Sequence, residues 1–198
     1  MKLTVAIQAG GTSQRMRSDK GLAPFLGRPL ISRVVGRLAS LADELLVTTN
    51  HPENYAFLGV RLEIDLLPGR GALGGLYTAL SVAQHSLVAV VACDMPFASA
   101  ELLQAECDLL VEGDYEAVVP RTLQGMEPFH AVYRRQACLR HVWAALEAGR
   151  QRVDDWFPAA RVGFMEADQI KRWDAAGLAF FNVNTPEDLQ KAERLASI

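Results

Sequence analysis

A run of seven residues, LVAVVAC at Leu87–Cys93, constrains the fold more than any other stretch of this chain. The run is almost wholly apolar, and Asp94-Met95-Pro96 follows it at once. A strand with one face in water alternates apolar and polar residues, whereas a central parallel strand is buried on both faces and shows no alternation. The run therefore predicts a central strand of a parallel sheet that is covered by helices on both faces.

Shorter apolar runs alternate with segments of helical periodicity along the rest of the chain. This alternation favours a mainly parallel, three-layer α/β sheet, in which ligands bind beyond the carboxyl ends of the strands. The expected strands are Leu3–Gln8, Glu44–Thr49, Arg61–Ile64, Leu87–Cys93, Glu116–Pro120, Phe129–Tyr133, Arg161–Met165 and Ala179–Asn182. The expected helices are Pro29–Leu41, Leu73–Ala83, Glu101–Val111 behind an N-cap at Ser99, Gln136–Glu147, and one that begins after Thr185.

Length and charge limit the classes of function. The 198 residues suit one domain, and the formal net charge of −3 disfavours non-specific binding to nucleic acid or to an anionic membrane. Any phosphate ligand must therefore be held by a local group of basic residues. The three cysteines form no CxxC pair, which favours a reducing compartment, and no window approaches a membrane span. We expect a soluble, cytoplasmic protein.

The first expected strand runs into a glycine-rich turn with three basic side chains. Gly10 and Gly11 allow backbone amides to come close to an anion, and Arg15, Arg17 and Lys20 add positive charge. Such a turn suits a triphosphate. It contains neither the GxxxxGK[ST] nor the GxGxxG pattern, so it is neither a Walker loop nor a Rossmann fingerprint. The alternative is a solvated basic turn, although its place after the first strand favours ligand binding.

Polar side chains also follow other expected strands. Asp94 ends the central apolar run, where its carboxylate suits Mg²⁺, an ion usually held by one or two carboxylates together with phosphates. The alternative for Asp94 is a turn or cap before Pro96. Asp65 follows another strand, and a solvated loop acid is its simpler interpretation. Cys93 is expected to be a small buried hydrophobe and not a nucleophile.

The segment QAGGTSQRMRSDKGL, followed by LGRPLI, resembles the pattern LAGGxSxRMGxDKxL and GxPLI of the molybdenum cofactor guanylyltransferases, the MobA family of the nucleotide-diphospho-sugar transferase superfamily. Further segments of the pattern recur in order along nearly the whole chain: ALGGL, CDMPF, EPFHAVY and FFNVNTPEDL. There are two departures. Gln8 stands where leucine is usual, and Arg17 replaces a glycine, a change that alters the loop conformation or adds another phosphate contact.

The resemblance implies a three-layer α/β/α, Rossmann-like nucleotidyltransferase fold in one domain, with a nucleotide half over about 1–110 and an acceptor half over about 111–198. It implies catalytic roles for Arg15, Lys20 and Asp94, nucleotide contacts from Gln8, Ala9, Gly10, Gly11, Lys20, Asn50, Asp65 and Asp94, metal ligation by Asp94 and Asn184, and acceptor contacts from His130, Asn182 and Asn184. Thr48 is an alternative to Asn50 as the nucleotide contact. The alternative for His130 is a structural role, which is the more common one for a lone histidine. The alternative for Asn184 is helix entry, since it stands at a helix start.

The reaction that the resemblance implies is attack by the terminal phosphate of molybdenum-molybdopterin on the α-phosphorus of GTP, with Mg²⁺ as cofactor and pyrophosphate as leaving group. Implied protein partners are other molybdenum cofactor biosynthesis proteins and molybdoenzyme chaperones.

Three rival functions share part of this pattern. A cytidylyltransferase would use CTP, but such relatives tend to carry LAAG where this chain has QAGG, and Gly10 leaves room for a purine. A sugar-1-phosphate nucleotidyltransferase would need a hexose pocket, which no segment of the sequence demands. A non-catalytic nucleotide-binding module could dispense with Asp94 and Lys20, and both residues are present.

Overall fold

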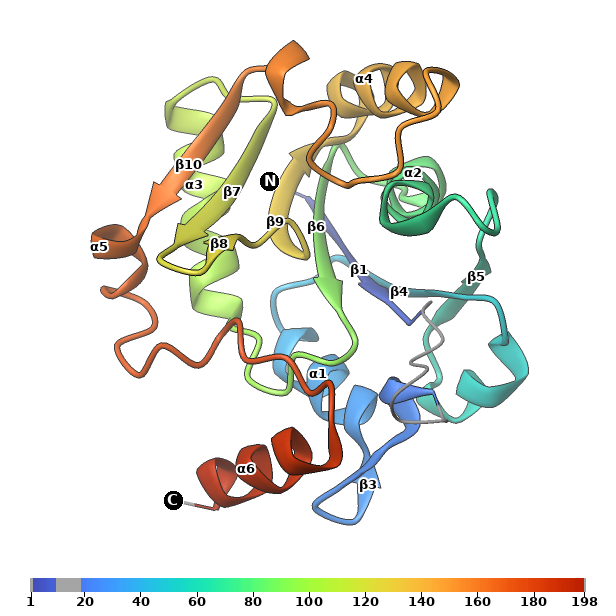
Figure 1. The fold of residues 1–198 in the computed structure, drawn as a ribbon, viewed down its shortest axis with the longest axis vertical. Helices are drawn as coiled ribbons and strands as arrows, with labels where there is room; N and C mark the ends of the chain where they lie inside the picture. Colours follow the sequence, from blue (N-terminus) through green and yellow to red (C-terminus); the bar gives the residue numbers. More distant parts are fainter. Residues whose placement is uncertain (1, 10–18, 198) are drawn as a thin grey trace.

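A mixed sheet runs through the centre of the computed structural model, which describes residues 2–9 and 19–197 (Figure 1). Its strands lie in the order β10-β7-β9-β6-β1-β4-β5, and β8 pairs with β7. The strands are β1 (Leu3–Gln8), β4 (Glu44–Thr49), β5 (Arg61–Ile64), β6 (Leu87–Ala92), β7 (Ala117–Thr122), β8 (Gly125–Met126), β9 (His130–Arg134) and β10 (Val162–Glu166). A separate hairpin joins β2 (Pro24–Phe25) to β3 (Arg28–Pro29).

The middle of the sheet is parallel, as the sequence predicts. β1 pairs in parallel with β4 on one side and with β6 on the other, so that Val5 lies opposite both Leu45 and Ala89. Two strands are antiparallel to their neighbours: β9 to both β6 and β7, and the short β8 to β7. Because β1, β4 and β6 point the same way, their carboxyl ends meet at one edge of the sheet, where ligands bind in open α/β sheets.

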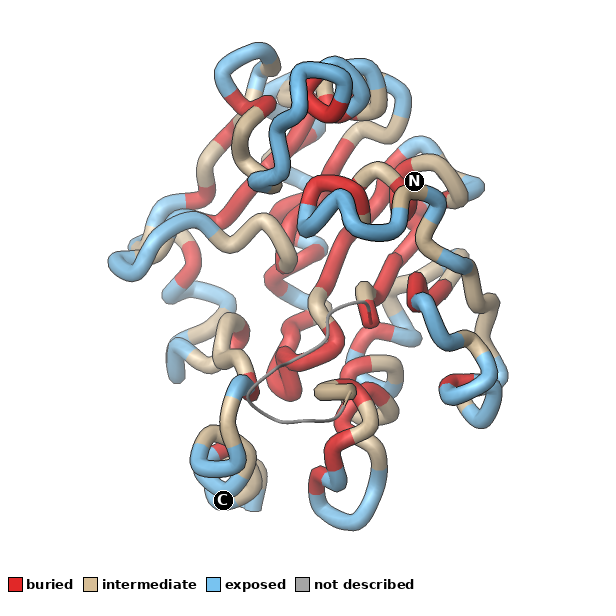
Figure 2. The backbone as a smooth tube through the Cα atoms, turned by 45° about the vertical axis from the view of Figure 1, so that its right-hand side comes forward, coloured by how far each residue is buried: buried red, intermediate tan, exposed pale blue. Residues whose placement is uncertain are grey.

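Helices cover both faces of the sheet, in three layers. α1 (Leu30–Leu38) and α3 (Ala100–Glu112) pack on the face that carries Val5 and Ile7, whereas α2 (Gly71–Val82) and α4 (Arg135–Glu147) pack on the face that carries Ala6. Figure 2 shows the buried residues gathered along the strands. The short α5 (Ala167–Ile170) follows β10, and α6 (Pro186–Ala196) ends the chain. Over the described residues, no helix is both long and apolar enough to cross a membrane.

The caps that the sequence predicts are present. The Ser99 side chain accepts a hydrogen bond from the Leu102 amide at the start of α3. Thr185 caps α6 in a reciprocal arrangement with Asp188, and Pro186 stands in the first turn, where its missing N–H costs nothing.

The expected strand Ala179–Asn182 is wrong, because the structure has a turn there and then an irregular segment up to α6. The Asp174 carboxylate accepts hydrogen bonds from the amides of Leu178 and Ala179, and the Phe181 amide donates to the Leu178 carbonyl. These local bonds satisfy the backbone groups that a neighbouring strand would otherwise have to pair.

Candidate active site

The described site is built where the carboxyl ends of β1, β4 and β6 meet. The Cys93 amide after β6 donates to the Gln8 carbonyl at 3.0 Å, and the Ala9 amide after β1 donates to the Thr48 carbonyl of β4 at 2.8 Å. These bonds continue the sheet pairing past the last strand residues and fix where each strand exit points. Of the predicted glycine turn, Gly10, Gly11, Arg15 and Arg17 lie outside the described residues.

Lys20, Asp94 and Asn184, predicted separately, come together at this edge. The Lys20 ammonium donates to Asp94 Oδ2 at 2.9 Å and to Asn184 Oδ1 at 2.5 Å. The Lys20 and Asp94 side chains are 22% and 12% exposed, so the pair remains open to a ligand. The three residues are separated by 74 and 164 positions along the chain, and the fold therefore creates the cluster.

A backbone hydrogen bond joins the segment that carries Asp94 to the segment that carries Asn184. The Val183 amide donates to the Asp94 carbonyl at 2.9 Å, which holds Asn184 beside Asp94. Asn184 is fixed from the other side, because its amide donates to Asp188 Oδ2 in the first turn of α6. The backbones of Asp94 and Asn184 are thus both restrained, and their side-chain oxygens both point toward the Lys20 ammonium.

Arginines of α1 hold the segment that follows Asp94. Arg33 Nε donates to the Pro96 carbonyl at 2.9 Å, and Arg37 Nε donates to the Ala98 carbonyl at 2.7 Å. The Arg33 guanidinium also lies 5.6 Å from the ring centroid of Phe97. Neither arginine was predicted from the sequence, since basic residues on an amphipathic helix normally indicate a solvated face.

The donor set suits Mg²⁺. Asp94 and Asn184 present a carboxylate and an amide oxygen to a single ammonium ion, and hard oxygen ligands of this kind are those that Mg²⁺ takes. Within residues 2–9 and 19–197, no group of three or more histidine, cysteine or acidic side chains could hold a metal. A site with one carboxylate suits an ion whose remaining ligands are phosphates and water.

The predicted nucleotide contacts of the first strand lie beside this cluster. Ala9 is buried, and the Gln8 side chain lies against the place where a side chain at Gly75 would stand, 3.1 Å from Gln8 Oε1. Gln8 Nε2 is buried without a hydrogen-bond partner among the described residues. The absence of a side chain at Gly75 therefore leaves room for glutamine where the family pattern has leucine.

The predicted contacts at the ends of β4 and β5 lie in different surroundings. Asn50 is exposed directly after β4, whereas Thr48 is buried within the strand. Asp65 Oδ1 accepts hydrogen bonds from Thr78 Oγ1 at 2.6 Å and from the Leu67 amide at 3.1 Å. These bonds fix the Asp65 carboxylate against α2, and Asp65 remains a predicted nucleotide contact.

Cys93 behaves as the sequence predicts for a buried hydrophobe. Burial raises the pKa of the Cys93 thiol, and the neighbouring Asp94 carboxylate raises it further. The thiol therefore stays protonated and is a poor nucleophile.

The predicted acceptor contacts differ in exposure. Asn182 is partly buried, and its Nδ2 donates to the Phe180 carbonyl at 3.0 Å. His130 is completely buried, and both of its ring nitrogens are engaged: Nδ1 lies 3.1 Å from Glu106 Oε1, and Nε2 accepts from the Ser99 amide at 3.2 Å. The structure thus corrects the expectation that His130 touches the acceptor, because its side chain has no open surface.

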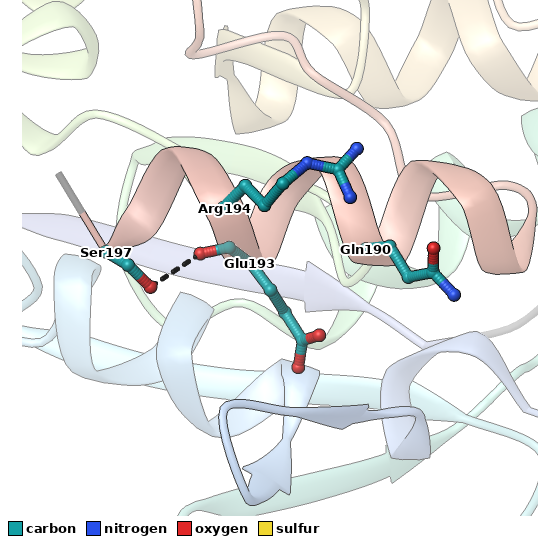
Figure 3. Close-up of a pocket in the computed structure, with 4 residues that line it drawn as sticks. All are labelled: Gln190, Glu193, Arg194 and Ser197. Atoms are coloured by element: carbon teal, nitrogen blue, oxygen red, sulfur yellow. Dashed lines mark hydrogen bonds between the residues drawn. The ribbon is translucent and has the colours of Figure 1, made fainter.

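A shallow depression on the last turns of α6 contains none of the predicted site residues (Figure 3). Its lining residues are Gln190, Glu193, Arg194 and Ser197. Glu193 joins α6 to the β2–β3 turn by accepting a hydrogen bond from the Leu26 amide at 2.9 Å. The depression is therefore a feature of α6 and is distinct from the cluster around Asp94.

An open, mainly parallel sheet with a lysine, a carboxylate and an amide at its carboxyl edge defines the chain as an α/β protein of the nucleotidyltransferase class. The model of the MobA-like NTP transferase domain matches residues 5–161. The chain belongs to the MobA-like NTP transferase family.

Relatives and solved structures agree with this assignment. A probable molybdenum cofactor guanylyltransferase of Pelotomaculum thermopropionicum is 37% identical over 99% of this chain and 94% of its own length. A molybdenum cofactor guanylyltransferase of Desulfosudis oleivorans is 33% identical over 96% and 94%. The crystal structure of molybdopterin-guanine dinucleotide biosynthesis protein A from Archaeoglobus fulgidus has the same fold, with a TM-score of 0.85, 24% identity and coverage of 98% of each chain.

Proposed function

We propose that this protein transfers GMP from GTP to the terminal phosphate of molybdenum-molybdopterin, which forms the molybdopterin guanine dinucleotide cofactor and releases pyrophosphate. The observation that carries the proposal is the meeting of Lys20, Asp94 and Asn184 at the carboxyl edge of the parallel strands. The two guanylyltransferase relatives support it, because their similarity extends over nearly the whole chain.

The chemistry requires little beyond orientation and charge neutralisation. An oxygen of the acceptor's terminal phosphate attacks the α-phosphorus of GTP, the bond to the β-phosphate breaks, and pyrophosphate leaves. The attacking phosphate is already ionised near neutral pH, so that no general base is needed. Lys20 supplies a fixed positive charge, and Gly10, Gly11 and Arg15 are proposed to bind the β- and γ-phosphates with it.

Asp94 and Asn184 are the residues that would hold Mg²⁺. When bound, the ion supplies neutralisation of the phosphate charge as a Lewis acid. The other proposed nucleotide contacts are Gln8, Ala9, Asn50 and Asp65, and Asn182 and Asn184 are proposed to face the acceptor. We expect the reaction in the cytoplasm, where other cofactor biosynthesis proteins and molybdoenzyme chaperones would be its partners.

A reconstitution with purified components tests the function. The protein is incubated with molybdenum-molybdopterin, Mg²⁺ and an equimolar mixture of GTP and CTP, and both pyrophosphate and dinucleotide products are measured. We expect pyrophosphate release that depends on the acceptor, with the guanine dinucleotide as product. A cytosine dinucleotide as main product would overturn the assignment of the base. Turnover with sugar 1-phosphates but not with molybdenum-molybdopterin would overturn the assignment of the acceptor.

A further inference from the structure

A buried polar cluster lies at the start of β9, behind the proposed metal ligands. His130 and Glu106 are both fully buried, with His130 Nδ1 3.1 Å from Glu106 Oε1. The Ser99 amide donates to His130 Nε2 at 3.2 Å. Because Nε2 accepts this bond, it carries no proton, and the ring proton lies on Nδ1, where it is donated to Glu106. The three groups therefore form one directed chain of hydrogen bonds.

Stability alone does not account for this cluster. Burial raises the pKa of Glu106 to about 7, although the neighbouring His130 opposes the rise. Glu106 Oε2 is buried without a hydrogen-bond partner among the described residues. A buried polar group left unsatisfied typically costs about 1–3 kcal/mol, and apolar residues often replace buried polar pairs without loss of stability. Burying Glu106 and His130 thus carries a desolvation cost that the two hydrogen bonds of the cluster do not offset at Glu106 Oε2.

The cluster touches both segments that carry the oxygen ligands. On one side, Ser99 ends the segment that begins at Asp94. On the other side, the His130 ring meets the Phe180 ring edge to face, with centroids 5.2 Å apart, and Phe180 lies four residues before Asn184. A second aromatic contact, between Phe97 and Phe181 at 6.0 Å, joins the same two segments.

We propose that His130, oriented by Glu106, is a positioning residue that holds the Asp94–Ser99 segment and the Phe180–Asn184 segment in register, so that Asp94 and Asn184 bind the same divalent cation. The role rests on the proposed nucleotide transfer, but it concerns cation binding and not contact with the acceptor. Residues that orient metal ligands from behind commonly change metal affinity by 10- to 100-fold when they are replaced.

A matched pair of amide substitutions tests this role. In His130→Gln the side-chain oxygen can reach the position of Nε2 and accept from the Ser99 amide. In His130→Asn the side chain is one bond too short to do so. The measurement is the dissociation constant of Mn²⁺, followed by electron paramagnetic resonance at saturating nucleotide, because it reports cation binding without turnover. We expect about tenfold weaker Mn²⁺ binding for His130→Asn and recovery to within about threefold of the native value for His130→Gln.

Thr4→Val is the control for general loss of stability. Thr4 is fully buried in β1 at the opposite end of the sheet, where its hydroxyl donates to Glu44. We expect it to lower the melting temperature and to leave Mn²⁺ affinity unchanged. Folded His130→Asn protein with native Mn²⁺ affinity would overturn the proposal. Should that variant fail to fold, Phe180→Leu, which keeps an apolar side chain on the core but removes the aromatic contact with His130, is expected to weaken Mn²⁺ binding several-fold, and native affinity there would equally overturn the proposal.

The native protein separates this inference from the proposed function. If native protein with Mn²⁺ binds CTP in preference to GTP, the proposed function fails. The same comparison of His130→Asn with His130→Gln is then made with Mn²⁺ and CTP, and its outcome still decides the positioning role.

Discussion

Asp94 is the single acidic side chain in the described cluster of Lys20, Asp94 and Asn184. Its side chain and its backbone carbonyl contact different groups. The Lys20 ammonium lies 2.9 Å from Oδ2 and neutralises the carboxylate, while the Asp94 carbonyl accepts from the Val183 amide. The backbone of Asp94 therefore holds the site together, and its side chain supplies the charge. A substitution that changes only the side-chain charge separates these two roles.

Asp94→Asn is expected to lower kcat by about 10²- to 10³-fold, the scale of losing one preorganised electrostatic contact. The amide keeps the shape of the carboxylate but loses its charge. The free energy of unfolding should fall by at most about 1–3 kcal/mol, because the pair is largely buried but the amide oxygen can still accept from the Lys20 ammonium. Initial rates of pyrophosphate release and urea unfolding curves check the two expectations. Near-native turnover in Mg²⁺ would remove Asp94 from the proposed metal site.

Glu106→Gln is expected to stabilise the protein at pH 8 relative to the native chain, with no such gain near pH 4.5. The carboxyl ionises near pH 4.5 when unfolded but at about 7 when folded. As the pH rises from 4.5 through 7, the unfolded state therefore loses the proton first, and the native fold is destabilised by up to about 3 kcal/mol. Glutamine resembles the protonated form at every pH. Because Glu106 is hydrogen-bonded to His130, the difference between the unfolding curves of the two proteins across this range measures the contribution of the Glu106–His130 pair.

At the scale of elements, the start of α6 is part of the site. Asp188 Oδ2 accepts from both the Asn184 amide at 3.1 Å and the Thr185 amide at 3.0 Å. The same carboxylate thus closes the cap of the helix and fixes the backbone of a proposed metal ligand. Helix entry and ligand placement, which the sequence left as two interpretations of Asn184, occur together.

Asp188→Ala should cost about 1 kcal/mol of unfolding free energy, the usual loss for a helix cap, and should also raise the Mg²⁺ concentration needed for half-maximal activity. Glu187→Ala is the matched control. It removes the same charge from the same first turn, but Glu187 is absent from the capping box of α6. Chemical unfolding and Mg²⁺ titration are measured for both variants. Equal Mg²⁺ requirements in the two variants would show that the cap does not position Asn184.

Local sequence signals located most of the elements. The strands β1, β4, β5 and β6 were placed within one residue of their ends, because turn residues bound each of these runs along the sequence. The antiparallel direction of β9 was not predicted, because periodicity carries no information on strand direction. Ala179–Asn182 was wrong because the Asp174 carboxylate provides the hydrogen bonds there, and the pattern of apolar residues does not reveal such a bond.

At the scale of the whole molecule, the candidate site depends on contacts between distant segments. The sequence predicted Lys20, Asp94 and Asn184 one by one, through the family resemblance, whereas the hydrogen bonds that unite them span 74 and 164 positions. Arg33, Arg37 and Glu106 were missed for the same reason. Each is an ordinary residue on an amphipathic helix until the fold brings a backbone carbonyl or a buried histidine against it.

If one polyphosphate and one cation share the carboxyl edge of this sheet, GTP and Mg²⁺ should stabilise the protein together more than the sum of their separate effects. Ligand at about 100 times its dissociation constant adds about 2.7 kcal/mol, which corresponds to a rise of roughly 5–10 °C in Tm for a chain of this size. Differential scanning fluorimetry with GTP, Mg²⁺, both, and both with EDTA measures the coupling, and Asp94→Asn serves as the control that should lose it. Additive shifts in the native protein would mean that cation and nucleotide bind independently, and the shared site around Lys20, Asp94 and Asn184 would then be wrong.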